Sequence, residues 1–355
     1  METGAESVGG ATGLLTDRLL IQVEADKVSD ALPLVEAGGS GIVVTGEEAT
    51  YLASSAWRAE LDEPLLIDRR RYAGKSRKLG TAKLSRPWME AQRQLGVATL
   101  LTDSGYVGQG DEASLHAILE QTAELDGDAT AVLPLHTSWL SPARIQLLIS
   151  AVCAYDVPVA LVLEHKSDPL GSRQAATGLA RLLQQPMTSV SLLCTDVSGL
   201  GALSFGAQWA AVGVTSKLRH LYPTDSRGGG GGRPPARHAL VAPLLSLMSV
   251  DRIAEGWAAT HHDADLERDI WRCTCSTCGN RTMEWLATAS AAELTAHTFQ
   301  LLLDVREGLA QLQPNARQES WLCKCRDAIW RNEDLSHRSG LNWQVPRFLR
   351  AWCPA

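Results

Sequence analysis

Short apolar runs alternate with longer amphipathic stretches from Leu19 to Ser216. Runs that are apolar on both faces are typical of strands in a parallel sheet, and the stretches between them of crossover helices. Eight such runs with short intervening helices favour a closed (β/α)8 TIM barrel over an open doubly wound sheet. The predicted strands are Leu19–Glu24, Gly41–Thr45, Pro64–Asp68, Val97–Asp103, Thr130–His136, Val159–His165, Val190–Asp196 and Ala210–Ser216.

The stretches between these runs carry helix signals, with Ser, Asp or Pro at several of their starts. Glu24-Ala25-Asp26-Lys27 follows the first run, where a dinucleotide-binding fold carries its glycine fingerprint. The open-sheet alternative is weaker for that reason. The predicted helices are Val28–Ala37, Glu48–Glu60, Pro87–Leu95, Glu112–Glu124, Pro142–Ala154 and Arg173–Gln184.

Polar residues collect where the predicted strands end, and in a barrel this carboxyl-terminal end carries the chemistry. For any one of them a solvated loop role is the alternative, because loops after strands are generally polar. The residues are Glu24, Asp26, Thr45, Asp68, Asp103, Ser104, His136, Glu164, His165, Asp196, Ser198 and Lys217.

The net charge and the apolar runs of the sequence indicate which partners and which cell compartment to expect. The chain has 355 residues, a net charge of −7 and a pI of about 5.7, so no sequence-wide positive field draws it to nucleic acid or an anionic membrane. The first residues lack the features of a signal peptide, and no apolar run reaches the roughly 18 residues that span a bilayer. We expect a cytoplasmic protein without membrane contact.

The same reading divides the chain into four parts. Residues 1–16 are expected to be a disordered tail, 17–250 the barrel, 251–312 a zinc-binding subdomain with the closing barrel helix, and 313–355 an α-helical extension rich in Trp and Arg. The glycine run at 228–232 predicts a basic loop, either a surface linker or a mobile phosphate contact. The tryptophans of the extension favour packing onto the barrel over exposure.

Three thiols stand within six residues, at Cys273, Cys275 and Cys278, and Gly279 permits a tight turn after them. Clustered cysteines of this kind favour a metal site over disulfides in a reducing compartment. The fourth ligand of a tetrahedral zinc is predicted to be His297, at the start of an amphipathic stretch. Four protein ligands leave no position for water, so the zinc is predicted to be structural.

Two weaker readings accompany this one. The adjacent His261 and His262 compete as ligands, although neighbouring side chains point apart on most backbones. Cys323 and Cys325, with His337 or Cys353, are candidates for a second site.

The order of a barrel, a Cys-x-Cys-x-x-Cys motif and a His opening a final helix resembles the tRNA-guanine transglycosylases, including relatives that place 7-deazaguanine bases in DNA. Thr102-Asp103-Ser104-Gly105-Tyr106 is similar to the segment that carries a catalytic aspartate in that family. The resemblance, which spans about residues 19–309, implies that Asp103 is an acid/base carboxylate and that Ser104 contacts the substrate. A carboxylate suits this chemistry, because base exchange passes through a cation-like sugar centre.

The chain departs from the family at the nucleophile. Where the family carries an aspartate after the eighth strand, this chain has Thr215-Ser216-Lys217. Either Asp196 attacks or stabilises the sugar, or the covalent step is absent. His136 stands where the family reads the guanine edge, and Glu164 and His165 stand near its glutamine, so a different base, or none, is implied. The remaining candidates for substrate contact are Tyr106, Ser198 and Lys217.

Three functions follow as hypotheses. The first is a pentosyltransferase that exchanges or cleaves a purine or 7-deazapurine base of tRNA, DNA or a nucleoside, with Asp103 and Asp196 as catalytic carboxylates and Zn²⁺ as scaffold. The second is a catalytically silent barrel that binds nucleic acid or pairs with an active subunit; a homodimer and a heteromer are both open. The third is an unrelated barrel hydrolase or lyase that uses His136, Glu164, His165 and Asp196.

Overall fold

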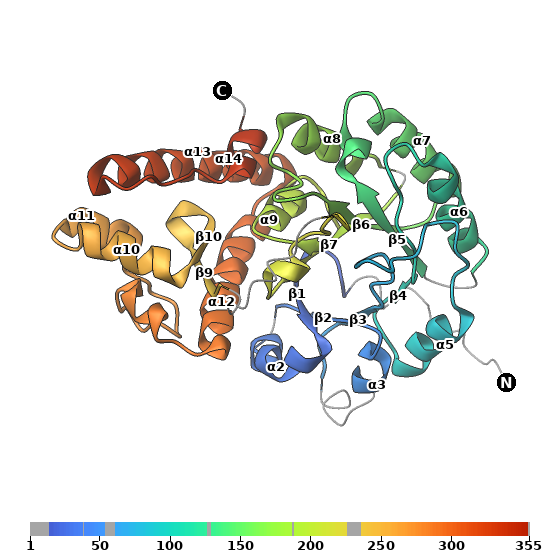
Figure 1. Ribbon diagram of the computed structural model, residues 1–355, viewed down its shortest axis with the longest axis horizontal. Coiled ribbons are helices and arrows are strands. Elements are labelled where there is room, and N and C mark those ends of the chain that lie inside the picture. The colour runs from blue at the N-terminus through green and yellow to red at the C-terminus, as the bar shows by residue number, and fades with distance from the viewer. Residues whose placement is uncertain are drawn as a thin grey trace.

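The computed structural model describes residues 14–37, 39–53, 61–125, 129–186, 188–225 and 236–353. The expected disordered tail therefore lies outside the described residues up to residue 13, as does the glycine run at 228–232. Eight parallel strands form a nearly closed barrel, in the order β3-β2-β1-β8-β7-β6-β5-β4 (Figure 1). Between its two edges, the amide of Ala98 donates to the carbonyl of Leu65 at 3.0 Å. The predicted (β/α)8 fold is confirmed.

The strands lie close to their predicted positions. β4 is the exception, because only two of its residues pair with β5. Beyond them the Thr102 hydroxyl takes over, accepting the amide of Val132 at 2.8 Å. The strands are β1 (Arg18–Glu24), β2 (Ile42–Thr45), β3 (Leu65–Asp68), β4 (Leu100–Leu101), β5 (Ala129–His136), β6 (Val159–Glu164), β7 (Val190–Thr195) and β8 (Trp209–Gly213).

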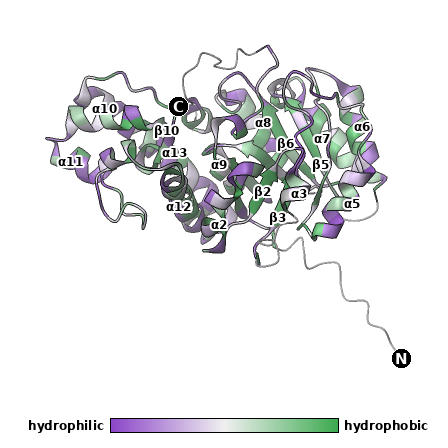
Figure 2. Ribbon diagram, turned by 60° about the horizontal axis from the view of Figure 1, so that its bottom comes forward, coloured by the Kyte–Doolittle hydropathy of each residue, from purple (hydrophilic) through white to green (hydrophobic). Residues whose placement is uncertain are grey.

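The strand residues are buried on both faces, as predicted. Alternate side chains point to opposite faces of a strand, so one set fills the barrel and the other packs against the helices. Figure 2 shows the strands as the hydrophobic centre of this half of the molecule. One cluster of buried side chains draws on each of the eight strands: Leu20, Val43, Leu66, Leu101, Val132, Ala160, Leu193 and Ala211.

Helices surround the strands (Figure 1). Ser85, Asp111 and Ser172 cap three of them by accepting amide hydrogen bonds in the first turn. Ser198–Ser204, for which no helix was predicted, forms the short helix α9. Residues 54–60 of the predicted helix Glu48–Glu60 lie outside the described residues. The helices are α2 (Val28–Glu36), α3 (Ala49–Ala53), α5 (Arg86–Leu95), α6 (Glu112–Ala123), α7 (Ile145–Tyr155), α8 (Arg173–Leu183) and α9.

The last barrel helix, α12 (Ala291–Ala310), comes only after a long insertion that follows β8. It packs against α2, α9 and β1, which closes the ring of helices. A capping box formed by Ser290 and Glu293 fixes its start. The insertion contains β9 (His238–Val241), β10 (Ser246–Ser249), α10 (Val250–Thr260) and α11 (Ala264–Leu266), and it forms the other lobe in Figure 1.

The C-terminal extension is helical, with α13 (Pro314–Ser339) and α14 (Arg347–Trp352). α13 contacts α9, α10 and α12, and α14 packs on α8. Trp321, Trp343 and Trp352 are buried as expected, whereas Trp330 is 63% exposed. None of the described helices is both long and apolar enough to cross a membrane.

Candidate metal centre and barrel mouth

Cys273, Cys275, Cys278 and His297 converge in the insertion and are all buried. Their ligand atoms lie within 4.8 Å of one another. The three sulfur atoms are 3.7, 3.5 and 3.2 Å from Nδ1 of the imidazole. The predicted set of four residues can therefore hold one metal ion.

A tight turn after Cys275 and a hydrogen bond of His297 orient these ligands. The amides of Cys278 and Gly279 donate to the carbonyl of Cys275, and Gly279 has a φ of +58°, the turn for which a glycine was expected. Nε2 of His297 lies 2.8 Å from the carbonyl oxygen of Leu240 in β9. Because Nε2 carries the proton, Nδ1 presents a lone pair to the sulfur atoms. Hydrogen bonds from Cys273 and Cys278 lower the pKa of the Cys275 thiol.

The competing ligands do not join this cluster. His261 and His262 are exposed at the end of α10. Cys323 accepts from Arg326 at 2.9 Å, and Cys353 donates to the carbonyl of Leu322 at 3.0 Å. Across the described ranges no second group of three or more ligand residues occurs, so the suggested second site is not formed there.

Asp103 lies at the carboxyl end of β4, with no exposed side-chain surface. Its Oδ2 accepts from Arg69 at 2.9 Å and from Arg71 at 2.6 Å, and its Oδ1 accepts the amide of Ser85 at 2.8 Å. Both arginines belong to the β3–α5 loop, residues 69–85, which folds over this end of the barrel. The carboxylate is thus fully engaged by the chain itself, while Ser104 bonds the hydroxyl of Thr102 at 2.7 Å.

Glu164 is engaged in the same way by the same loop. Arg77 donates to its Oε1 at 2.5 Å, and the Tyr106 hydroxyl donates to its Oε2. The guanidinium of Arg77 also lies 3.5 Å from the centre of the Tyr106 ring. Burial and the bond to Glu164 raise the pKa of Tyr106 well above its usual value. Two of the predicted site residues, Tyr106 and Glu164, therefore meet, but as partners of each other.

A third buried carboxylate, Asp68, accepts from the Tyr72 hydroxyl at 2.6 Å and from the amide of Arg70 at 2.9 Å. Burial raises its pKa. Next to it, Cys194 interrupts β7 with a φ of +51°, and its amide donates to the Gln22 side chain at 2.7 Å. The hydrogen bond compensates a backbone conformation that non-glycine residues rarely adopt.

Asp196 and Ser198 follow β7, and the Ser198 amide donates to Asp196 at 2.9 Å. Within the part of the chain that the structure describes, Asp196 shares no hydrogen-bonding partner with Asp103. The buried Ser198 hydroxyl and Nε2 of His220 have no hydrogen-bonding partner in the described residues. Lys217, the last of the predicted contacts, pairs with Glu24 across the ends of β8 and β1 at 2.5 Å.

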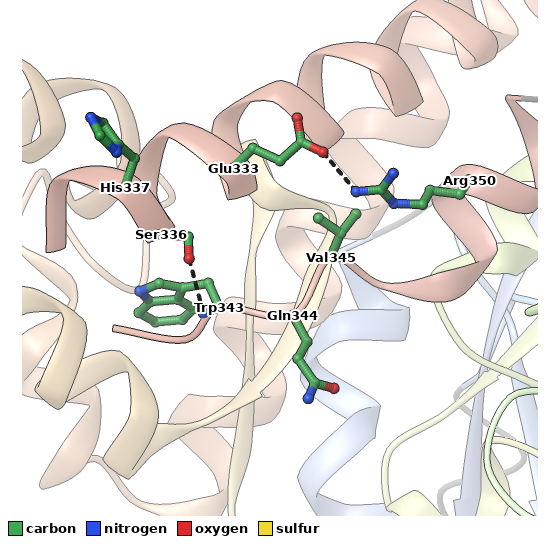
Figure 3. Close-up of a pocket in the computed structure, with 7 residues that line it drawn as sticks. All are labelled: Glu333, Ser336, His337, Trp343, Gln344, Val345 and Arg350. Carbon is green, nitrogen blue, oxygen red and sulfur yellow. Dashed lines mark hydrogen bonds and ion pairs between the residues drawn. The ribbon is translucent and has the colours of Figure 1, made fainter. Parts of the chain in front are cut away.

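His136 and His165 line a pocket of about 360 Å³ at the ends of β5 and β6, together with Asp168 and Arg347. A larger, open hollow of about 560 Å³ lies between α13, the segment that leads into α14, and Arg350 of α14 (Figure 3). There the Glu333 carboxylate accepts from Arg350 at 2.6 Å. None of the predicted site residues lines that hollow.

Sequence reasoning missed the arginines that neutralise the mouth: Arg69, Arg71 and Arg77. A signal was present, because Arg69-Arg70-Arg71 directly follows a strand of the predicted barrel. Basic residues in that position face the carboxylates at the ends of neighbouring strands. Arg347 had no such signal, because it reaches the barrel from the C-terminal extension.

No protein-family model matches this chain, and no curated protein does.

Proposed function

We propose that this chain is a transglycosylase-like barrel that performs no base exchange by itself and serves as a non-catalytic subunit beside an active transglycosylase chain. Its metal is zinc and its metal site is structural. The observation that carries the proposal is the double ion pair of Asp103 with Arg69 and Arg71.

The metal identity rests on the donor set. Three thiolates and one imidazole are typical of structural zinc. Zinc–sulfur and zinc–nitrogen bonds of about 2.3 and 2.0 Å in a tetrahedron separate sulfur from nitrogen by about 3.5 Å. The sulfur–Nδ1 distances of 3.2 to 3.7 Å span that value. A closed site without room for water supports a scaffold role.

The silent role rests on what a catalytic carboxylate needs. To move a proton or stabilise a cationic sugar, Asp103 must contact substrate, but its two carboxylate oxygens already accept from Arg69, Arg71 and the amide of Ser85. Withdrawing both arginines leaves a buried charge without compensation, at a cost of about 3–5 kcal/mol. Glu164 is held in the same way by an ion pair with Arg77.

The end of β8 supports the same conclusion. Thr215 occupies the region where the resembling family carries its nucleophile, and the Lys217 that follows pairs with Glu24. A cation there opposes the positive charge that builds on the sugar as the base departs. Asp196 accepts from the amide of Ser198 in its own loop, and within the described residues no hydrogen bond or ion pair joins it to Asp103 or to the arginines that hold Asp103.

The test is a base-exchange assay with radiolabelled guanine, adenine and 7-deazaguanine, using purified chain and, separately, tRNA and duplex DNA as acceptors. We expect no incorporation by the chain alone. We also expect faster incorporation when it is added to an active transglycosylase from the same cell. Turnover by the wild-type chain that disappears in Asp103→Asn would reject the silent role.

That outcome would favour the second candidate, a base-exchanging enzyme. One observation favours it: a buried carboxylate ends β4 next to Ser104, at the end of the barrel where substrates bind. In that case substrate must displace Arg69 and Arg71, and the apparent affinity for the acceptor would rise when they are replaced.

A further inference from the structure

The pocket at the ends of β5 and β6 includes neither Asp103 nor Glu164, nor the arginines that pair with them. It has a volume of about 360 Å³ and is lined by hydroxyls, two imidazoles, one guanidinium and the Asp168 carboxylate. β5 ends at His136, His165 directly follows β6, and α14 begins at Arg347. Segments far apart in the sequence thus build one polar cavity.

The two imidazoles each accept a backbone amide at Nδ1, which leaves Nε2 as the nitrogen that can donate. Nδ1 of His136 accepts the amide of Ser138 at 3.1 Å. Nδ1 of His165 accepts the amides of Ser167 at 3.1 Å and Asp168 at 2.9 Å. An acceptor nitrogen carries no proton, so each neutral ring has its N–H at Nε2. Within the described ranges no acceptor for either Nε2 is found.

Arg347 is exposed at the first position of α14, and no described carboxylate lies within ion-pair distance of it. Asp168 lines the same pocket, but its carboxylate accepts backbone amides. Its Oδ1 accepts the amide of Leu170 at 3.0 Å, and it also accepts the amide of Phe348, which ties the start of α14 to the pocket. A Cβ on Gly171 would lie 2.7 Å from Asp168 Oδ2 and 3.0 Å from Cβ of Arg347. A side chain at Gly171 would therefore push the Asp168 carboxylate or Arg347 from its place.

Charged groups of both signs act on the pocket, and Arg347 is the cation that lines it. Lys166 and Arg347 act on His165, and burial together with these cations and His136 lowers the pKa of that imidazole. The opposing groups are Asp168 and Asp196. Burial, and then the charge of Asp196, raise the pKa of Asp168 to about 7, so its negative charge is incomplete at neutral pH. The N-terminus of α8, capped by Ser172, adds its positive end.

We propose that this pocket binds a phosphate group, with Arg347 as the cation and the imidazoles of His136 and His165 as neutral donors. Its volume is at the lower end of the roughly 300–1,000 Å³ typical of small-molecule sites. It therefore suits a phosphomonoester such as a nucleoside 5′-monophosphate. A phosphate of a nucleic-acid backbone offers the same chemistry. The site is independent of whether the chain exchanges bases.

The experiment is a calorimetric titration of the full chain with inorganic phosphate, adenosine 5′-monophosphate and a short single-stranded oligonucleotide, at constant ionic strength set by chloride. We expect saturable binding of phosphate and the monophosphate. Arg347→Gln should weaken it about tenfold, since a hydrogen bond to a charged group contributes about 1.5–3 kcal/mol. Arg350→Gln, on the same helix but paired with Glu333 (Figure 3), should leave it unchanged.

Imidazole NMR gives a second readout. A bound anion should raise the pKa of His165 by about half a unit or more while the exposed His116 does not move. His136→Asn and His165→Asn should each weaken binding. Equal binding by the Arg347 and Arg350 variants, or no saturation by any of the three ligands, would overturn the proposal. Saturation by the oligonucleotide alone would assign the phosphate to a nucleic acid.

Discussion

The imidazole of His297 donates to the carbonyl oxygen of Leu240 at 2.8 Å, so one side chain joins the closing barrel helix, strand β9 and the cysteine cluster. α12 is covalently part of the barrel ring, and the cysteines are part of the insertion. The metal site therefore fastens two structural units through a single residue. Removing the metal should therefore weaken the attachment of the insertion to the barrel, in addition to the loop that carries the thiols.

Loss of a cysteine ligand should release the metal and loosen the insertion. We expect about one zinc per wild-type chain and almost none in Cys275→Ser, with a loss of more than about 4 kcal/mol in unfolding free energy. Elemental measurement by mass spectrometry and urea unfolding check both. Cys153→Ser, on the half-buried part of α7, should retain the zinc. Full zinc content in Cys275→Ser would contradict the Cys₃His assignment.

The arginines over Asp103 should matter for stability. Replacing Arg69 and Arg71 together by Gln leaves a fully buried carboxylate without its cations, and we expect a loss of about 3–5 kcal/mol. Adding Asp103→Asn should recover part of that loss, because the amide carries no charge. Urea unfolding measures both effects. Arg86→Gln is the matched control, because Arg86 is exposed and forms no ion pair within the described residues. A double variant as stable as this control would contradict the stabilising role of the two ion pairs to Asp103.

His220 should make the fold sensitive to acid. Burial lowers its pKa to about 4 from an ordinary value of 6.5, so the folded state binds fewer protons than the unfolded state between these values. The stabilisation is present above pH 6.5 and is lost as the pH falls toward 4, by at most about 3 kcal/mol. His220→Phe, which can keep the stacking on Tyr222, should flatten this slope in urea titrations. His116→Gln should not, and equal slopes in both variants would exclude the effect.

Gly256 in α10 should tolerate no side chain. A Cβ there would lie 2.5 Å from Trp343 and 2.7 Å from Trp271, so the insertion and the C-terminal extension pack together at this point. We expect Gly256→Ala to cost about 1–3 kcal/mol. Gly308→Ala, in α12 with open space around it, should instead stabilise by about 1 kcal/mol through helix propensity. Thermal unfolding distinguishes the two, and equal shifts would be inconsistent with the packing.

The alternation of apolar runs with amphipathic stretches was sufficient for the barrel, because strands buried on both faces have few other stable arrangements. The thiols and His297 were also readable, because zinc demands four suitable donors and the chain offers them close to a glycine turn. These features depend on residue type and spacing along the chain. The helix α9 was not predicted, because the small residues of Ser198–Ser204 carry only a weak helix signal. Packing against β7 and β8 stabilises this helix in the fold.

Tertiary structure decided which polar groups are free. Asp103 and Glu164 look like reactive carboxylates when only their positions after strands are known. Their partners, Arg71 and Arg77, come from another strand's loop, and no local pattern reports which guanidinium reaches which carboxylate. Arg347 illustrates the same point, since it reaches the barrel mouth 182 positions after His165. Hydrogen bonds and ion pairs act over a few ångströms in space, a distance that spacing along the chain does not specify.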